Sequence, residues 1–210
     1  MSRPALSGGF ADPVRAAQAT FRALADALSR PGRPVALTAA IAPPAPLTPE
    51  LAVIAATLAD ADTSLWLDES LAASGDVADW LRFHTGARIT GDRAEATFAL
   101  VAHPAALPPL GAFAFGSDAY PDRSTTLVLA VDGFDGAPAV RLSGPGLAVP
   151  ADFAVRPLGA AFWAAVAATR GGFPRGLDLF FAGAGAVAGL PRSTRLAVLD
   201  DATVEAEPCT

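Results

Sequence analysis

The sequence predicts a single α/β domain in which a mixed β-sheet is flanked by helices. Three observations support this class: helical stretches alternate with short apolar strands, apolar residues make up 52% of the chain, and no glycine-rich dinucleotide loop joins a strand to a helix. No stretch of linker composition separates two cores, so residues 1–210 form one domain. We expect a short flexible N-terminus of about residues 1–9 and a C-terminal tail of about residues 201–210.

An amphipathic helix is expected first. Asp12 is followed by Pro13, which is the pattern of an N-cap and a first helical position, and Pro31-Gly32 stops the helix. Its apolar residues repeat on one face and are Val14, Phe21, Leu24 and Leu28.

Strands and helices alternate through the middle of the chain. After a short strand at residues 35–37 and a proline-rich loop, Thr48-Pro49-Glu50 begins a helix that runs to about Asp60. Residues 64–67 are predicted to be a strand, and Ser74 caps a third helix. The apolar side chains of that helix are Val77, Trp80, Leu81 and Phe83.

Two hairpins are predicted in the second half. Residues 96–101 form a strand, and the strands 125–131 and 139–142 are separated by turn-forming residues, which predicts a hairpin. A helix over residues 158–169 ends at two glycines. The second predicted hairpin follows it, with strands at residues 177–181 and 186–190.

All fifteen positive charges are arginines, and the chain contains no lysine. Lysine is the residue that forms Schiff bases and supplies the cation of a phosphate-binding P-loop, so both enzyme classes are disfavoured. Arginine can hold phosphate or carboxylate through two parallel hydrogen bonds. A GC-rich coding bias also explains the missing lysines, but it does not explain why several arginines lie in short stretches rich in glycine and proline.

Composition and motifs exclude several further classes. The formal net charge of −6 argues against nucleic-acid binding. No signal peptide or membrane-spanning segment is found, so we expect a cytoplasmic protein without a membrane partner. Cys209 cannot form a disulfide within the chain, and His84 and His103 lack metal-ligand spacing. Without a G-x-S-x-G elbow, hydrolase chemistry is disfavoured, and we assign no catalytic, cofactor-binding or metal-binding residue.

The segment Leu81-Arg-Phe-His-Thr85 is the first candidate anion site. It places the guanidinium of Arg82, the imidazole of His84 and the hydroxyl of Thr85 within one helical turn. The alternative is that His84 caps the helix C-terminus, where a cation is also favourable.

Three more arginines are candidate anion ligands. Arg141 precedes the stretch Ser143-Gly-Pro-Gly146, which either presents backbone amides to an anion or makes a tight turn. Arg175 and Arg192 flank the last hairpin, so their side chains should emerge at neighbouring loop ends. They either grip a phosphate or an acidic partner, or one of them pairs internally with Asp178.

Seven of these segments together resemble the PhnH family, a subunit of the bacterial carbon-phosphorus lyase machinery. The segments occur in the family's order along nearly the whole chain. They are Phe21-Arg22, Ser29-Arg-Pro-Gly32, Thr57-Leu-Ala-Asp-Ala-Asp-Thr63 with Trp66-Leu67, Leu81-Arg-Phe-His-Thr85, Arg141-Leu-Ser-Gly-Pro-Gly146, Phe173-Pro-Arg-Gly-Leu-Asp178 and Pro191-Arg-Ser-Thr194.

The resemblance implies a fold related to the large domain of pyridoxal-phosphate-dependent transferases but without the cofactor, which agrees with the missing lysine. It implies a homodimer that joins the G, I and J subunits in a core complex. That complex transfers the ribose triphosphate of ATP to an alkylphosphonate and releases adenine. We therefore expect an accessory, non-catalytic subunit. The alternative is a phosphate, phosphonate or nucleotide site formed by Arg82, His84, Arg175 and Arg192.

Overall fold

The computed structural model describes residues 6–137 and 139–199. Five α-helices and ten strands are assigned there, joined by loops and short 3-10 turns. The helices are α1 (Pro13–Ser29), α2 (Pro49–Leu58), α3 (Glu69–Ala72), α4 (Gly75–Thr85) and α5 (Ala160–Thr169). The strands are β1 (Val35–Ala36), β2 (Ser64–Leu67), β3 (Arg88–Ile89), β4 (Phe98–Val101), β5 (Thr126–Ala130), β6 (Val140–Ser143), β7 (Ala151–Phe153), β8 (Asp178–Gly183), β9 (Ala186–Leu190) and β10 (Arg195–Val198).

The helices begin where local sequence predicts. The Asp12 side chain caps α1 by accepting a hydrogen bond from the backbone N–H of Arg15. The hydroxyls of Thr48 and Ser74 cap α2 and α4 in the same way. The three predicted helix starts are therefore confirmed.

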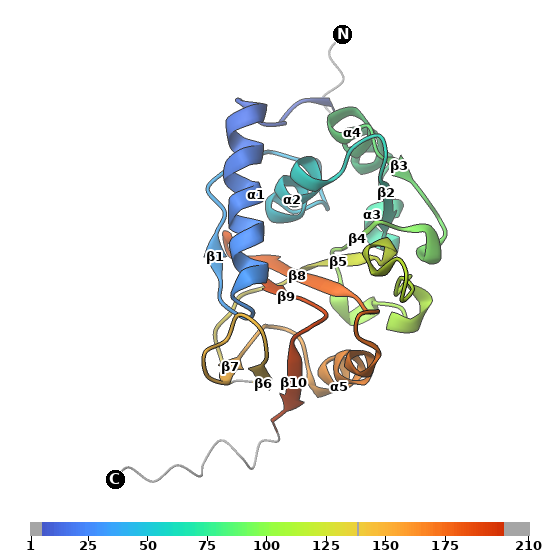
Figure 1. The fold of residues 1–210 in the computed structure, drawn as a ribbon. Helices are drawn as coiled ribbons and strands as arrows, with labels where there is room; N and C mark the ends of the chain where they lie inside the picture. Colours follow the sequence, from blue (N-terminus) through green and yellow to red (C-terminus); the bar gives the residue numbers. More distant parts are fainter. Residues whose placement is uncertain (1–5, 138, 200–210) are drawn as a thin grey trace.

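A seven-stranded mixed sheet forms the centre of the molecule, which confirms the predicted class (Figure 1). Its strand order is β1-β9-β8-β5-β4-β2-β3. The strands from β3 to β8 in this order are parallel to one another, whereas β9 is antiparallel to both β8 and β1. The hairpin predicted at the end of the chain is β8–β9.

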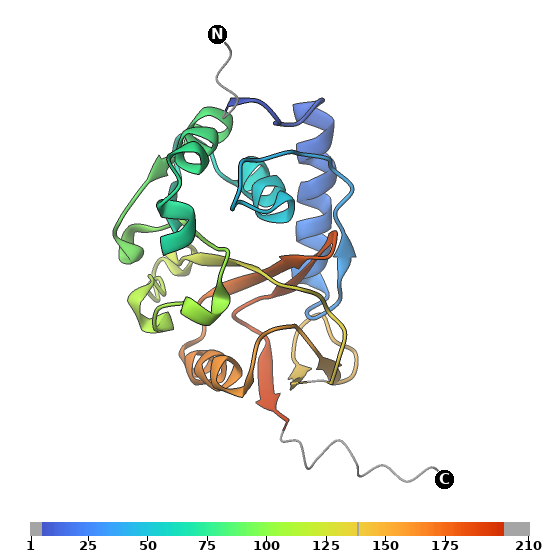
Figure 2. The same cartoon turned by 180° about the vertical axis from the view of Figure 1, so that it is seen from behind.

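Both faces of this sheet are buried, so successive residues of one strand enter different cores. In β5, Leu127 and Leu129 belong to one apolar cluster and Val128 to the other. The cluster around Val128 is covered by α1, α2 and α4. The cluster around Leu127 is covered by α5 and a second, smaller sheet, as the front and back views show (Figures 1 and 2).

The second sheet corrects one prediction. Residues 126–130 and 140–143 do not form a hairpin, because β5 lies inside the central sheet and β6 in a separate three-stranded sheet of order β10-β6-β7. The turn after β5 leads the chain out of the central sheet. β6 then pairs antiparallel with β7 and with β10, which lies more than fifty positions later.

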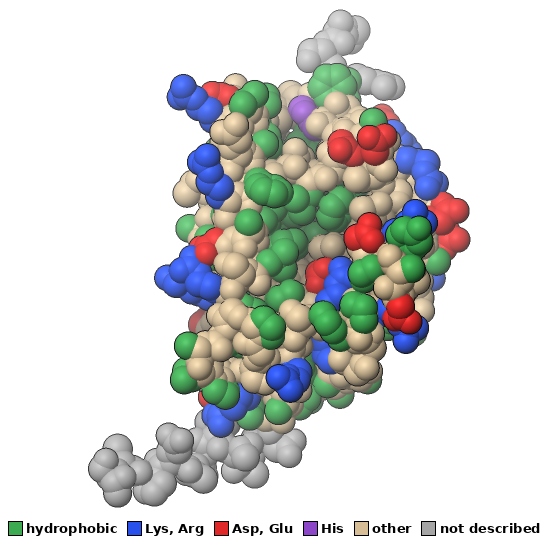
Figure 3. Space-filling view, in the orientation of Figure 1, with side chains coloured by type: hydrophobic (Ala, Val, Ile, Leu, Met, Phe, Trp, Pro, Cys, Tyr) green, Lys and Arg blue, Asp and Glu red, His purple; other side chains and the backbone are tan. Residues whose placement is uncertain are grey.

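The apolar stripe of α1 is only partly buried. Leu24 lies in the core, but the side chains of Val14 and Phe21 are 68% and 58% exposed. Phe83 on α4 is also exposed rather than in the core. Figure 3 shows hydrophobic side chains gathered on the surface beside α1.

The beginning of the described chain is tied to the body of the protein. The indole N–H of Trp80 donates to the Ser7 carbonyl at 2.9 Å, and the amide of Ala42 donates to the Gly8 carbonyl at 2.8 Å. The expected tail at residues 201–210, with Cys209, lies outside the described residues. Within residues 6–137 and 139–199, no helix has the length and apolar character that crossing a membrane requires.

Candidate functional site

Arg192 is the motif arginine that is most firmly held within the chain. Its guanidinium contacts the carboxylate of Asp178, with Nε 3.1 and 3.2 Å from the two oxygens, and its Nη1 donates to the carbonyl of Pro121. The two side chains are only 17% and 19% exposed. Asp178 begins β8 and Arg192 follows β9, so the ion pair joins the two open ends of this hairpin. The predicted alternative that one of the two flanking arginines pairs internally with Asp178 is therefore confirmed, and that arginine is Arg192.

A second arginine binds to the same end of the β8–β9 hairpin. Arg170 donates from Nη1 to the carbonyls of Leu177 and Pro191, both at 3.1 Å. Burial lowers the pKa of Arg170 to about 10, while the negative charge of Asp178 acts in the opposite direction. The strand ends of this hairpin are therefore fixed by two guanidinium groups from different segments.

Arg175 takes a different position. Its Nε lies 3.3 Å from a carboxylate oxygen of Asp118, and both side chains are largely exposed. Such an exposed pair contributes little to stability and leaves most of the guanidinium in contact with solvent.

The three candidates at the end of α4 have different surroundings. The Nη1 atom of Arg82 lies 3.6 Å from Oδ1 of Asp79 at the surface. The hydroxyl of Thr85 donates to the Leu81 carbonyl at 2.6 Å and accepts from the amide of Ala87 at 3.0 Å, so it completes the helix end. These contacts are local helix-terminus interactions.

His84 turns inward instead. Its ring packs on that of Trp80, with 4.4 Å between the ring centres, and lines a pocket of about 290 Å³ beside Gly9, Val14 and Ala56. Its Nε2 atom is buried and has no hydrogen-bond partner among the described residues. Burial lowers the pKa of His84, and a backbone hydrogen bond with Leu6 acts in the opposite direction.

Arg141 lies on the small sheet. It faces Asp152 on the neighbouring strand and binds it through two hydrogen bonds of 2.7 and 3.0 Å. This contact lowers the pKa of Asp152. The turn after it joins β6 and β7, and a Cβ atom at Gly146 would lie 2.2 Å from the Ser29 carbonyl. The glycine is therefore required by the packing of the two family-like segments against each other.

The structure does not show the six candidates in one cleft. Arg82, His84 and Thr85 are on α4, on the side of the central sheet that α1 and α2 cover, whereas Arg192 precedes β10 on the side of α5 (Figure 1). His84 lines the pocket of about 290 Å³ beside α1, and none of the other five candidates lines that pocket. Anion binding by these residues stays a prediction.

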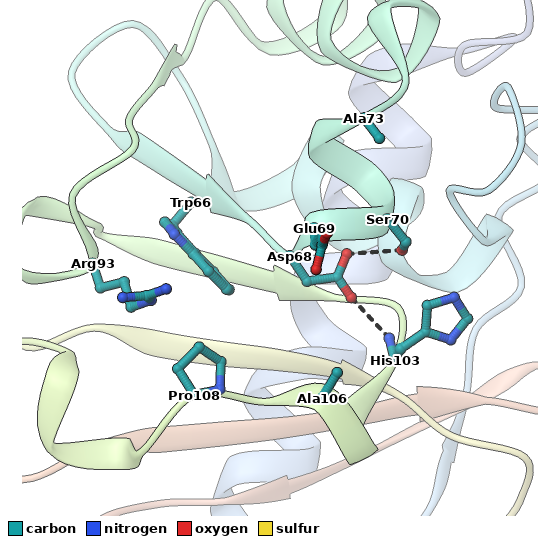
Figure 4. Close-up of a pocket in the computed structure, with 9 residues that line it drawn as sticks. All are labelled: Trp66, Asp68, Glu69, Ser70, Ala73, Arg93, His103, Ala106 and Pro108. Carbon is teal, nitrogen blue, oxygen red and sulfur yellow. Dashed lines mark hydrogen bonds between the residues drawn. The ribbon is translucent and has the colours of Figure 1, made fainter.

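A pocket that was not predicted from the sequence lies at the carboxyl ends of β2 and β4. It has a volume of about 430 Å³ (Figure 4). The chain leaves β2 toward β3 on one side of the sheet and leaves β4 toward β5 on the other. This change of direction is a topological switch point, the place where open α/β sheets bind ligands.

Asp68 is the central polar residue of this pocket. It follows β2 directly and is 5% exposed. Its Oδ1 accepts from the hydroxyl of Ser70 and the amide of Leu71, and its Oδ2 accepts from the amide of His103 at 2.9 Å. These three bonds fix the orientation of the carboxylate. The signal in the sequence was a polar residue at the carboxyl end of each of two buried strands, Asp68 directly after β2 and His103 two positions after β4.

The other polar side chains surround Asp68. Glu69 lies next to it, and Arg93 and His103 lie on opposite sides of the two carboxylates (Figure 4). The guanidinium carbon of Arg93 is 5.4 Å from the ring centre of Trp66, which is a cation–π contact. Among the described residues, no group of three His, Cys, Asp or Glu side chains has the arrangement of a metal site.

The fold and this pocket define an α/β protein with a ligand-sized cavity at the switch point of a mostly parallel sheet. The sequence model of the family described as bacterial phosphonate metabolism protein (PhnH) matches residues 8–197. The chain therefore belongs to the PhnH family, as its segments indicate. It is 44% identical over 190 residues to a protein of Rhizobium meliloti (strain 1021), alpha-D-ribose 1-methylphosphonate 5-triphosphate synthase subunit PhnH. The aligned region covers 90% of this chain and 94% of that protein.

Proposed function

We propose that this chain is an accessory subunit of a ribose 1-methylphosphonate 5-triphosphate synthase within a carbon-phosphorus lyase core complex. It supports the transfer of the ribose triphosphate of ATP to an alkylphosphonate with release of adenine. The observation that carries the proposal is the 44% identity over nearly the full length of a protein with that name. The proposed compartment is the cytoplasm, and the proposed partners are the G, I and J subunits and a second copy of the chain.

The motif arginines support a structural role. Arg192 and Arg141 use their guanidinium groups in bidentate contacts with carboxylates of the same chain. Replacing Arg192 would remove a largely buried ion pair and so disturb the fold itself, whereas the more exposed Arg141 pair joins two strands of the small sheet. This is the behaviour expected of residues that maintain a docking scaffold.

Helix α5 supports a contact with another subunit. No charged residue occurs in it, yet only Trp163 and Val166 are buried. Ala161 and Ala165 line a groove of about 390 Å³ together with proline-rich residues 104–109. A helix that is apolar all round is typical of a buried position. We propose that another subunit of the synthase covers this face.

The proposed ancestry also fits the sequence. We propose that the fold is related to the large domain of pyridoxal-phosphate-dependent transferases. Such enzymes hold the cofactor as a Schiff base with lysine, and no lysine exists in this chain. The residues present therefore do not fit pyridoxal phosphate.

The test is complementation. A bacterial strain that lacks its own H subunit is given this chain and grown with methylphosphonate as the phosphorus source, and tagged G and I subunits are used to measure assembly. Wild type should restore growth and copurify, and Ala165→Arg should reduce both. Ala19→Arg is the matched control, since Ala19 is exposed on α1 between Arg15 and Arg22.

Two outcomes contradict the proposal. Failure of the wild type to assemble or to restore growth would refute the subunit assignment. Loss of growth with intact assembly in Arg82→Ala or Arg192→Ala variants would refute the accessory role and favour the alternative, a phosphate, phosphonate or nucleotide site that takes part in the transfer.

A further inference from the structure

We propose that the pocket at the carboxyl ends of β2 and β4 binds a ribose that carries a phosphoryl or phosphonyl group at each end. The inference deepens the proposed function and rests on it, because the reaction of that synthase supplies the ligand class. The position of the pocket is an independent argument, since it lies at the switch point of the sheet.

The charge pattern of the pocket matches such a ligand. Two carboxylates, of Asp68 and Glu69, lie in the middle, and the cationic Arg93 and the imidazole of His103 lie on opposite sides of them (Figure 4). A ribose with anionic groups on C1 and C5 has the complementary pattern, with hydroxyl donors in the middle and negative charges at both ends. A nucleobase or an apolar ligand would leave the charged groups without partners.

Asp68 has capacity for a ligand hydroxyl. An ionised carboxylate accepts about four hydrogen bonds, and Asp68 accepts three within the chain, two of them on Oδ1. Among the described residues, only the amide of His103 donates to Oδ2, which can therefore accept a further hydrogen bond. Because its orientation is already fixed, little conformational freedom is lost when a hydroxyl binds.

Arg93 and His103 are available for the anionic groups. Neither side chain has an ion pair or a hydrogen bond with any other described residue, and both are exposed. The contact with Trp66 restricts the guanidinium of Arg93 while leaving its N–H groups unbonded. Arginine binds phosphoryl oxygens through its planar fork, and an imidazole N–H can donate to one of them.

The remaining walls fit a sugar ring. Trp66, Ala106 and Pro108 provide apolar surface between the polar groups. A volume of about 430 Å³ lies within the usual range of small-molecule sites, about 300–1,000 Å³. The Glu69 carboxylate also repels a phosphoryl group from the centre of the pocket, which favours binding with the anionic groups at its two ends.

The experiment is calorimetric titration of the full-length protein with α-D-ribose 1,5-bisphosphate. Ribose 5-phosphate, methylphosphonate and inorganic phosphate are the comparison ligands. We expect the bisphosphate to bind more tightly than each of these. Arg93→Ala and His103→Ala should each raise its Kd about tenfold, the loss of about 1.4 kcal/mol. Arg88→Ala is the matched control, because Arg88 lies outside the pocket. The Kd of this variant for the bisphosphate should equal the wild-type value.

Three results would overturn the inference: no binding of the bisphosphate, binding that Arg93→Ala and His103→Ala leave unchanged, or equally tight binding of inorganic phosphate. Because both side chains are exposed, the variants should fold, and circular dichroism checks this. The complementation assay separates the two proposals. A protein that assembles and restores growth but does not bind the bisphosphate refutes only the ligand, whereas failure to assemble refutes the proposed function.

Discussion

Replacing Arg192 by alanine should lower the free energy of unfolding by about 3 kcal/mol. Removing one partner from a buried ion pair costs about 3–5 kcal/mol, because the other charge is left without compensation. Arg192 and Asp178 are 17% and 19% exposed, which places the cost at the lower end of this range. The variant also loses the hydrogen bond to the Pro121 carbonyl. For a domain of this size, about 3 kcal/mol corresponds to a fall in Tm of about 6–12 °C.

A double-mutant cycle measures the pair itself. Urea unfolding is followed by circular dichroism for the wild type, Arg192→Ala, Asp178→Asn and the double variant. We expect a coupling energy of about 1–3 kcal/mol, the range of residues that share one network. Arg88→Ala is the control, because Arg88 and Glu95 form an exposed pair whose loss should cost no more than about 0.5 kcal/mol. A loss below about 1 kcal/mol for Arg192→Ala, or a coupling energy near zero, would refute the assignment of a structural role to this pair.

Two further predictions concern packing and pH. Gly189→Ala should destabilise the protein by about 1–3 kcal/mol in urea unfolding, because the new Cβ would lie 2.7 Å from the backbone of Ala27 in α1. Gly75→Ala is its control, because outside its chain neighbours and its own helix backbone no described atom lies within 4 Å of the added carbon, and equal stabilities would contradict the packing argument. Burial lowers the pKa of His84, so its contribution to stability is present above the ordinary pKa of about 6.5 and is lost as the pH falls through the lower folded-state pKa. The Tm of the wild type should therefore fall more steeply below about pH 6.5 than that of His84→Gln, and parallel curves would contradict this.

Local signals in the sequence predicted most helices and strands. Which strands pair with one another depends on contacts between distant residues, so most of the sheet topology was not predicted. The caps at Asp12, Thr48 and Ser74 depend on residues within one turn, so the helix starts were predictable. The pairing of β6 with β10 joins residues far apart in the chain, and the turn after β5 carries no information about it. The sequence therefore indicated a hairpin that the fold does not contain.

The residue contacts of the candidate site were also hard to predict, because they depend on which distant segments the fold brings together. The arginine segments were recognisable, but Asp178 could have paired with Arg175 or Arg192, and only the hairpin geometry decides for Arg192. The pocket around Asp68 depends on which strands lie side by side. Asp68 and His103 are adjacent because β2 and β4 are neighbours, although β3 lies between them in sequence.

The pairing of the first strand with one of the last sets the order in which the protein can fold during synthesis. β1 hydrogen-bonds to β9, and the amide of Gly32, just after α1, donates to the carbonyl of Gly189 in β9. About 150 residues separate β1 from β9. At about 5–20 residues per second, a ribosome needs roughly 8–30 s to make them. During that time, α1 can pack on β1 and α2 but not on β9, so the face that carries Leu24 and Ala27 is completely covered only when nearly all of the chain has been made.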